Sequence, residues 1–565
     1  MRIGRVVRFS LISLLFVCAA YITILFSLLL TSYVAIKNGS WSTVEKTTYL
    51  INNLTQFSNS LGILGRPIQV IYHSNQALLH TISLGKSLES LFKSVTNIDS
   101  TDFSLVYDQF YLNYLELKKD ISFLTAQSWV DSLLNQSKDL KFAWQFYQQN
   151  QDYIDQAIML TPDLLGGDSE KHYTVLLQNN TEIRPTGGFM GSYVTFYFNK
   201  GKLINYEVSD IYVPDGAITG HIEAPISLQT AFGHGTWKLR DSNWDSDFTK
   251  AAQDIDWFLE RGGAGRRDGI VAVNLEVVED LINYLGKISV GDYKVVLTKE
   301  NLYETAQHQA EMNFFPGSTA KKDFLQQATN QLLAQIKLLN HNQMANLFEI
   351  ISHQFLQKNI QLYFKDAQAQ SIIAKLGWDG AIDWKKTEKG VQDYLYISEA
   401  NLGANKANCC ITRAAQRKVT FTPDKVIIKH TMKIDNNNNT NRPQPPEIWG
   451  GDFRDYIRFH LPSFAKNVTF SVNDNNNNID TDLVEVNKLE NSDVTVYGFF
   501  VVIPHQENKI ITVNYELPVE PKGQYSLYFQ KQSGIPSYPM LVELINNKGT
   551  FQSRKDLDRD QSMLF

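Results

Sequence analysis

The sequence predicts a multidomain α+β protein with an N-terminal transmembrane helix, a helical stalk or bundle, an α/β layer domain and a C-terminal β-sandwich. Three features support this order: a long uncharged run near the N-terminus, helical periodicity after it, and a later change first to strands alternating with helices and then to strands alone. The 565 residues are 43% hydrophobic and 12% aromatic, which is typical of folded domains. The expected boundaries are a cytoplasmic N-terminus at 1–8, the transmembrane helix at 9–36, the stalk at 37–165, the α/β domain at 166–414, the sandwich at 415–553 and a charged tail at 554–565.

The segment from Phe9 to Ile36 contains no Asp, Glu, Lys or Arg. About 20 apolar residues cross a bilayer as a helix, and an isolated span must be helical because its backbone groups have to pair within the segment. A cleaved signal peptide is the alternative. Its apolar region would be about 7–15 residues long and would end in a small-x-small site, which Tyr33–Ala35 matches poorly. We therefore expect an uncleaved signal-anchor.

The charges that flank this segment predict its orientation. Arg2, Arg5 and Arg8 precede it, whereas Lys37 is the only basic residue immediately after it. Because basic residues favour the cytoplasmic side, the protein should be a single-pass plasma-membrane protein with most of the chain extracytoplasmic.

Charge and cysteine content narrow the class of protein further. A net charge of −6 over the whole chain argues against nucleic acid as a main partner. The three cysteines are Cys18, in the predicted span, and the adjacent pair Cys409-Cys410. Adjacent cysteines rarely bridge each other because the geometry is strained, so we expect domains that do not depend on disulfides.

Apolar residues recur at three- and four-residue steps in Leu78–Val95 and Phe103–Leu124, and Trp129–Leu160 continues the pattern. This predicts the helical stalk, which would space the later domains from the membrane.

The pattern changes at Gly166-Gly167 to strands alternating with helices, which predicts the α/β domain. The expected strands are His172–Leu177, Gly191–Phe198, Gly269–Asn274 and Ile360–Phe364, and the expected helices are Thr249–Arg261, Leu275–Leu285, Lys299–Met312, Lys321–Leu339 and Gln343–Lys358.

After about Ala415 the helical period disappears and short strands separated by Asn, Gly and Pro turns predict a β-sandwich. The expected strands are Lys418–Thr422, Lys425–Lys433, Asn467–Val472, Val494–Val502 and Ile510–Tyr515. Two asparagine runs, Asn436–Asn439 and Asn475–Asn478, are expected at loop tips, and Asp474–Asp480 is a weak candidate for a calcium loop. The tail from Arg554 to Phe565 is expected to be frayed.

The first segment that could carry chemistry is Gln178–Tyr193, which follows a predicted strand. Ligands of α/β sheets favour such loops, glycines allow close approach of a backbone to an anion, and arginine binds phosphate or carboxylate with a forked donor. The alternative is a tight connection in which Arg184 pairs with Glu182. The candidate ligand-binding residues here are Asn179, Asn180, Glu182, Arg184, Gly187 and Gly188.

The second segment, Leu239–Phe248, places Asp241, Asn243, Asp245 and Asp247 at every second position. This spacing suits oxygen ligands for Mg²⁺ or Ca²⁺, although Ser246 and Ala252 exclude an EF-hand. The alternative is capping of the Thr249 helix, which would account for Asp247. Arg240, Asp241 and Asn243 are ligand-binding candidates, and Asp241 and Asp245 are metal candidates.

The third segment is Asn401–Lys406, which is either a domain-joining loop or a polar lip on a cleft, with Lys406 as the binding candidate. The histidines show no metal spacing, and there is no nucleophile elbow, P-loop or dinucleotide fingerprint.

Several ordered segments together resemble a bacterial family known as domain of unknown function 4012. They are YTVLLQNNTEIRPTGGFMGSY, RDSNWDSDF, DGIVAVNLEVVEDLINYLG, NLGANK, YELPVE and KQSG, and they extend roughly from Tyr173 to Gly534. The resemblance implies a membrane-anchored envelope protein without a settled activity. One departure is Asn408-Cys409-Cys410, where an acidic and an aromatic residue are more usual.

The order of these features is more distantly similar to LytR-CpsA-Psr enzymes, which transfer glycopolymers from a polyprenyl-pyrophosphate carrier to the cell wall. That resemblance implies that Arg184 and Arg240 contact the pyrophosphate and that Asp241 lies beside a Mg²⁺ ion. One departure is Thr186-Gly187-Gly188, which stands where those enzymes carry another acidic residue.

We therefore expect an extracytoplasmic envelope protein that binds an anionic or glycan ligand at the face of Arg184 and Arg240. The alternatives are a Mg²⁺-dependent phosphotransferase that moves a polyprenyl-pyrophosphate-linked glycopolymer to the cell wall, and an envelope scaffold whose sandwich binds another protein.

Overall fold

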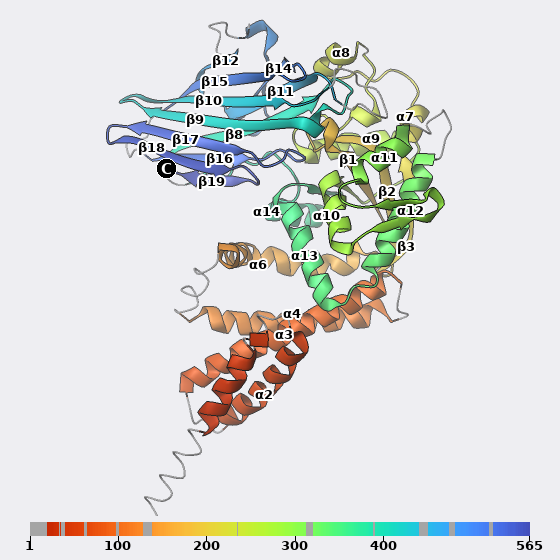
Figure 1. Ribbon diagram of the computed structural model, residues 1–565, viewed down its shortest axis with the longest axis vertical. Coiled ribbons are helices and arrows are strands. Elements are labelled where there is room, and N and C mark those ends of the chain that lie inside the picture. Colours follow the sequence, from red (N-terminus) through yellow and green to blue (C-terminus); the bar gives the residue numbers. More distant parts are fainter. Residues whose placement is uncertain are drawn as a thin grey trace, which may run out of the picture. The chain divides into compact units, whose positions relative to one another are not determined.

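The computed structural model describes residues 20–32, 34–35, 40–60, 65–97, 101–127, 138–233, 235–311, 320–387, 390–439, 450–473, 479, 481–518 and 524–565. The chain forms two compact units (Figure 1). Unit 1 comprises Met1–Gly167, Lys200–Lys202 and Leu339–Ala345, and unit 2 comprises Asp168–Asn199, Leu203–Leu338 and Asn346–Phe565.

Among the described residues, no helix is both long enough and apolar enough to cross a membrane. The predicted span 9–36 is described only in part, because residues 9–19, 33 and 36 lie outside the described residues. The span therefore stays a prediction.

Unit 1 is helical, as the periodicity of the sequence predicted. Tyr107 donates a hydrogen bond to the carbonyl of Ile158 at 2.7 Å, and the buried Asp120 accepts from the Nδ1 atoms of His73 and His80 at 2.7 and 2.8 Å. These bonds tie the helices together through polar groups as well as apolar packing. The helices are α2 (Trp41–Ser60), α3 (Gly65–Val95), α4 (Phe103–Thr125) and α6 (Lys138–Leu164).

The α/β part of unit 2 is built on a five-stranded sheet with the order β3-β2-β1-β4-β7. Its parallel pair among the described strands is β1–β4, whereas β1–β2 and β4–β7 are antiparallel. The sheet is therefore mixed, since β2 and β3 follow β1 without an intervening α-helix. The strands are β1 (Lys171–Asn179), β2 (Phe189–Asn199), β3 (Lys202–Asp210), β4 (Gly269–Asn274) and β7 (Ile360–Phe364).

Helix α9 (Phe248–Arg261) packs against this sheet because its apolar residues recur on one face. Ile255, Phe258 and Leu259 are fully buried in a cluster with residues of β1, β2 and β4, and Asp247 caps the helix by accepting from the Thr249 N–H. The remaining helices and short strands of this part are α7 (Tyr212–Ala217), α8 (Ile226–Phe232), α10 (Leu275–Leu285), β5 (Ile288–Val290), β6 (Val295–Leu297), α11 (Leu302–Glu311), α12 (Ala320–Ile336), α13 (His341–Leu356) and α14 (Ala367–Leu376).

The C-terminal part is a β-sandwich of two six-stranded sheets that share one apolar core. One sheet has the order β12-β15-β10-β9-β17-β18 and the other β13-β14-β11-β8-β16-β19 (Figure 1). The strands are β8 (Val391–Asn401), β9 (Ile411–Phe421), β10 (Lys425–Asn436), β11 (Phe453–Pro462), β12 (Lys466–Val472), β13 (Glu485–Lys488), β14 (Val494–Ile503), β15 (Asn508–Pro518), β16 (Tyr525–Gln530), β17 (Pro539–Asn546), β18 (Gly549–Asp556) and β19 (Gln561–Leu564).

The sandwich extends beyond the boundaries expected from the sequence at both ends. It begins with β8, upstream of residue 415, and residues 554–565 contribute the end of β18 and the strand β19, which pairs with β16, rather than a frayed tail. Asn436 and Asn438 are buried and hydrogen-bonded rather than at a loop tip. Residues 474–478 and 480, which include the second asparagine run and most of the weak calcium loop, lie outside the described residues.

A buried ion pair lies in the core of the sandwich. Arg417 and Asp393 are both 0% exposed and form an ion pair, and the hydroxyls of Tyr515 and Tyr525 also donate to Asp393. A buried charge is tolerated only when it is paired and hydrogen-bonded, so this cluster fixes β8 and β9 against β15 and β16.

We expect Asp393→Ala to lower the free energy of unfolding of unit 2 by about 3–5 kcal/mol, because it leaves the Arg417 charge buried without its partner. Chemical denaturation of the full chain measures this loss. The double variant Asp393→Leu/Arg417→Met, which removes both charges, should recover much of it. A single variant as stable as the double variant would show that the ion pair does not matter to the core.

Candidate functional site

The candidate segments meet at one edge of the α/β sheet. Strands β1 and β4 are parallel, so their carboxyl ends lie side by side, with Gln178 opposite Asn274. Strand β1 leads into the short helix η1 (Asn180–Glu182), and β4 leads directly into α10. This edge is where α/β sheets favour ligands.

Glu182 and Arg184 lie in the interior at this edge. One carboxylate oxygen of Glu182 accepts from Arg184 at 3.0 Å, and the other accepts from the ammonium group of Lys406. The Arg184 side chain is 2% exposed, and its guanidinium also donates to the carbonyl of Asn401 at the end of β8. The loop after β1 is thus bound to the sandwich through a buried charge.

The second predicted segment joins the same group. Arg184 lies 3.5 Å from an oxygen of Asp241, which lies in the short helix η2 (Leu239–Asp241), and Arg240 pairs with Asp215 at 2.6 Å. We call this set the charge network. It contains three cations and three anions, so it is neutral as a whole. Its members are Lys406, Arg184, Arg240, Glu182, Asp241 and Asp215.

Burial and pairing act in opposite directions on the carboxylates of the network. Burial alone would raise the pKa of Glu182, but Lys406 and Arg184 outweigh it, and the pKa lies below the ordinary value of 4.5. Glu182 therefore adds stability that is fully present above about pH 4.5 and is lost as the pH falls through its lower folded pKa. For Asp241, burial outweighs the two arginines and raises the pKa. The surroundings thus favour the charged form of Glu182 and disfavour the charged form of Asp241.

The Gly187-Gly188 turn packs against polar groups rather than facing open space. Gly187 has a φ of +135°, and a Cβ there would overlap the side chains of Asn274 and Gln178. Asn243 donates to the Gly188 carbonyl at 2.9 Å and to Thr186 at 3.0 Å. The glycines serve close packing of this turn.

The sandwich reaches the same turn through residues 532 and 533. Gln532 donates to the carbonyls of Arg184 and Glu399 at 3.1 and 2.8 Å, and Asn274 donates to Ser533 at 2.9 Å. The segment KQSG is part of the family resemblance, but its polar residues carry no sequence pattern that indicates their burial.

The alternation of Asp and Asn in the second segment does not build a cation site among the described residues. Asp247 caps α9, and Asp245 accepts from the Asp247 N–H at 2.8 Å. Asp241 turns toward the arginines. Within the described ranges no three His, Cys, Asp or Glu side chains gather in a way that could hold a metal ion.

A pocket of about 170 Å³ lies next to the network. Its walls come from η1, the start of α10, the short helix η4 (Ala407–Cys410) and residues 534–536, so it lies between the α/β part and the sandwich of unit 2. The residues that line it are Asn180, Thr181, Ile183, Leu275, Glu276, Glu279, Asn408, Cys409, Arg413, Gly534, Ile535 and Pro536. Of the residues predicted from the sequence, Asn180 lines this pocket.

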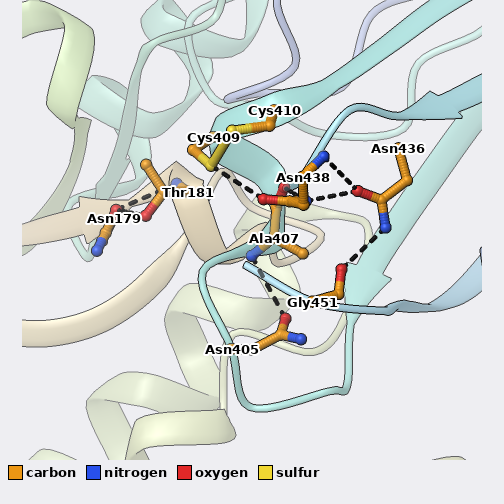
Figure 2. Close-up of a disulfide and its surroundings, with 9 residues drawn as sticks. All are labelled: Asn179, Thr181, Asn405, Ala407, Cys409, Cys410, Asn436, Asn438 and Gly451. Atoms are coloured by element: carbon orange, nitrogen blue, oxygen red, sulfur yellow. Dashed lines mark hydrogen bonds between the residues drawn. A yellow bond between two sulfur atoms is a disulfide. The ribbon is translucent and has the colours of Figure 1, made fainter. Parts of the chain in front are cut away.

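Cys409 and Cys410 form a disulfide beside the pocket, contrary to our expectation that adjacent cysteines would not bridge. Figure 2 shows the disulfide between the loop of Asn179 and Thr181 on one side and Asn436 and Asn438 on the other. Asn179 accepts from the Thr181 N–H at 3.1 Å and so caps η1. The disulfide thus stiffens one wall of the pocket.

Some polar atoms in the pocket walls have no hydrogen-bond partner among the described residues. They are Asn180 Oδ1, Glu276 Oε2 and Asn408 Nδ2, all of them buried atoms. Their side chains are held in place by other bonds, such as Asn408 Oδ1 accepting from the Ile183 N–H at 3.1 Å. A ligand that brought both donors and acceptors into the pocket would match such walls.

Two substitutions separate the buried and the accessible ends of the network. Arg184→Ala leaves Glu182 and Asp241 buried with one partner fewer, so we expect a loss of about 3–5 kcal/mol in the free energy of unfolding. Arg240 is 29% exposed, and Asp215 keeps its bond from the Leu239 N–H, so Arg240→Ala should cost about 1 kcal/mol. Denaturation curves of the two variants measure the difference, and equal losses would contradict the geometry of the network.

Comparisons with known proteins give one family and a set of remote structural likenesses. Similar solved structures include the Lin1025 protein of Listeria innocua, with 13% identity over 38% of this chain and 80% of that chain and a TM-score of 0.21. TagU of B. subtilis is similar at 14% identity, covering 34% of this chain and 78% of that chain with a TM-score of 0.23. The transcriptional regulator yvhJ of Bacillus subtilis is similar at 13% identity, covering 37% and 76% of the two chains with a TM-score of 0.22. These values are too low to support an argument about function, and no curated protein matches the chain. Residues 168–310 match the family described as "Protein of unknown function (DUF4012)". This match overlaps the segments that resemble the same family in the sequence.

Proposed function

We propose that this chain is a membrane-anchored protein of the cell envelope whose second unit binds a glycan without transforming it. The observation that carries the proposal is the pocket at the carboxyl ends of β1 and β4, which is closed on its other side by the sandwich.

The character of the pocket walls favours a glycan. Amide, hydroxyl and carboxylate groups alternate with apolar side chains, among them Leu275, Ile535 and Pro536. Sugars present hydroxyl groups at their edges and C–H groups on their faces, so they suit walls that combine a few placed polar groups with apolar surface.

The charge network is a poorer place for an anion than the sequence suggested. Arg184 and Lys406 are both paired with Glu182, and Arg240 is paired with Asp215. An anionic ligand would have to displace carboxylates that already neutralise these cations, so it would gain little. The network is better suited to hold the walls of the pocket in place.

The same pairing bears on the enzyme alternative. Transfer from a polyprenyl pyrophosphate would need Arg184 and Arg240 to be free to contact phosphate oxygens, as the LytR-CpsA-Psr resemblance implied. Arg184 is buried and committed to Glu182, Asp241 and a carbonyl of β8. Binding is therefore the function that the geometry supports better.

Two independent features support an extracytoplasmic location. The uncharged run from Phe9 to Ile36, with arginines on its N-terminal side, favours an anchor with the bulk of the chain outside. The Cys409–Cys410 disulfide is of a kind that persists in oxidising compartments and is rare in the cytosol.

The anchor can be tested by fractionation. The full-length chain should sediment with membranes, resist extraction by high salt and dissolve in detergent, whereas a variant lacking residues 9–36 should lose membrane association. Added protease should digest the full-length chain in cells whose outer layers have been made permeable but whose plasma membrane is intact. Protection of unit 2 under those conditions would contradict the proposed orientation.

Binding can be tested by calorimetry on the purified full-length chain with soluble oligosaccharides, both acetylated and deacetylated tetramers of glucosamine. We expect at least one tetramer to bind, and Thr181→Phe, which fills the pocket, to weaken that binding by tenfold or more. Thr230→Phe, on the exposed side of α8, is the matched control and should bind like the unmodified chain. No binding by either tetramer, or equal binding by both variants, would count against the pocket as a glycan site.

A further inference from the structure

Two carboxylates face the pocket from one helix. Glu276 and Glu279 are three residues apart on α10, so their side chains project from the same side, and both line the pocket. Asn180 donates to one oxygen of Glu276, and the other oxygen is buried without a partner among the described residues. For Glu279 the described part of the chain provides neither a hydrogen bond nor an ion pair.

The nearby cations are already committed elsewhere. Arg413, which lines the same pocket, binds Glu399 through two bonds of 2.7 Å. The ammonium group of Lys531 donates to the carbonyls of Gln357 and Gln532 at 3.0 Å each. Neither of these two cations therefore pairs with Glu276 or Glu279.

The titration of these two groups agrees with this geometry. Burial raises the pKa of Glu279 to about 6, helped by Glu276 and Asp280 and opposed by Lys299. Burial also raises the pKa of Glu276, against the pull of the Asn180 hydrogen bond and of Lys531. Both carboxylates would be stabilised in their charged form by a cation in the pocket.

We propose that the glycan bound in this pocket carries a free, protonated amino group, as an unacetylated amino sugar does. The inference rests on the glycan-binding function proposed above and names the ligand class. The ammonium group lies against Glu276 and Glu279, and a ring or hydroxyl oxygen of the sugar accepts from Asn408 Nδ2 on the opposite wall. Charge-assisted hydrogen bonds of this kind are the strong ones.

The walls fit an amino sugar better than a bare metal ion. The amide Nδ2 of Asn408 and the guanidinium of Arg413 are donors, and donors do not coordinate a metal ion. The volume of about 170 Å³ is smaller than the roughly 300–1,000 Å³ of pockets for drug-sized ligands, so it holds a single sugar residue of a longer chain.

The experiment compares the deacetylated glucosamine tetramer with its N-acetylated counterpart on the full-length chain, in buffer with EDTA. At pH 7 the deacetylated tetramer should bind at least tenfold more tightly. Its advantage should shrink as the pH is lowered from 7 to 5, because protonation of Glu279 near pH 6 removes one of the two charges. The binding of the acetylated tetramer should change little over this range.

Glu279→Gln tests the assignment of the charge. It should remove about a tenfold preference for the amine while leaving the binding of the acetylated tetramer unchanged. Glu260→Gln, an exposed position on α9, is the matched control and should keep the preference.

The possible outcomes separate the two proposals. Equal binding of both tetramers, or a preference that survives in Glu279→Gln, would overturn the amine inference and leave glycan binding standing. Absence of binding by both would remove the proposed function as well. Displacement of the deacetylated tetramer by Ca²⁺ in buffer without EDTA, at equal strength in Glu279→Gln, would show that the amine is not held by this carboxylate.

Discussion

The buried pair of Glu182 and Arg184 is the interaction on which unit 2 depends. The pair lies in the loop after β1. Its other partners are the carbonyl of Asn401, at the end of β8, and Lys406, between β8 and β9 of the sandwich. Because a charge in the interior is costly unless its partners are in place, the loop and the start of the sandwich must adopt their observed positions together. The walls of the pocket come from the α/β part and the sandwich, so their relative positions depend on this pair.

Local pattern was sufficient for elements whose residues alternate or recur in a regular way. The bounds of β4, α10 and β7 agree with the prediction, since each is an apolar run or an amphipathic repeat bounded by polar residues. Strand β8 was missed because Asp393, Ser398 and Glu399 interrupt its apolar residues. Its buried polar groups find partners such as Arg417 and Arg413 on β9, and such pairing cannot be read from the strand itself.

The sequence identified the right region for the candidate residues. It predicted that they bind a ligand, whereas in the structure they pair with one another in the interior. The sequence brought Arg184 and Asp241 into one hypothesis and offered Lys406 separately, as part of a polar lip on a cleft. The structure places all three in one network. Their burial could not be predicted, since the bonds join residues 57 and 224 positions apart. Asp215, Glu276 and Glu279 were missed because a single acid in a loop, or acids on a helix, look the same whether they face solvent or a pocket.

The pairing of β8 has a consequence for how the chain is made. Its neighbours in the sheet are β11 and, in parallel, β16, so residues 391–401 acquire one partner only after residues 525–530 have been synthesised. Until then β8 presents an unpaired edge, and Asp393 lacks the hydrogen bonds that Tyr515 and Tyr525 donate to it in the folded protein. Contacts so distant in sequence form slowly and leave a nascent chain prone to aggregation. Production of this protein should therefore benefit from a chaperone that shields strand edges.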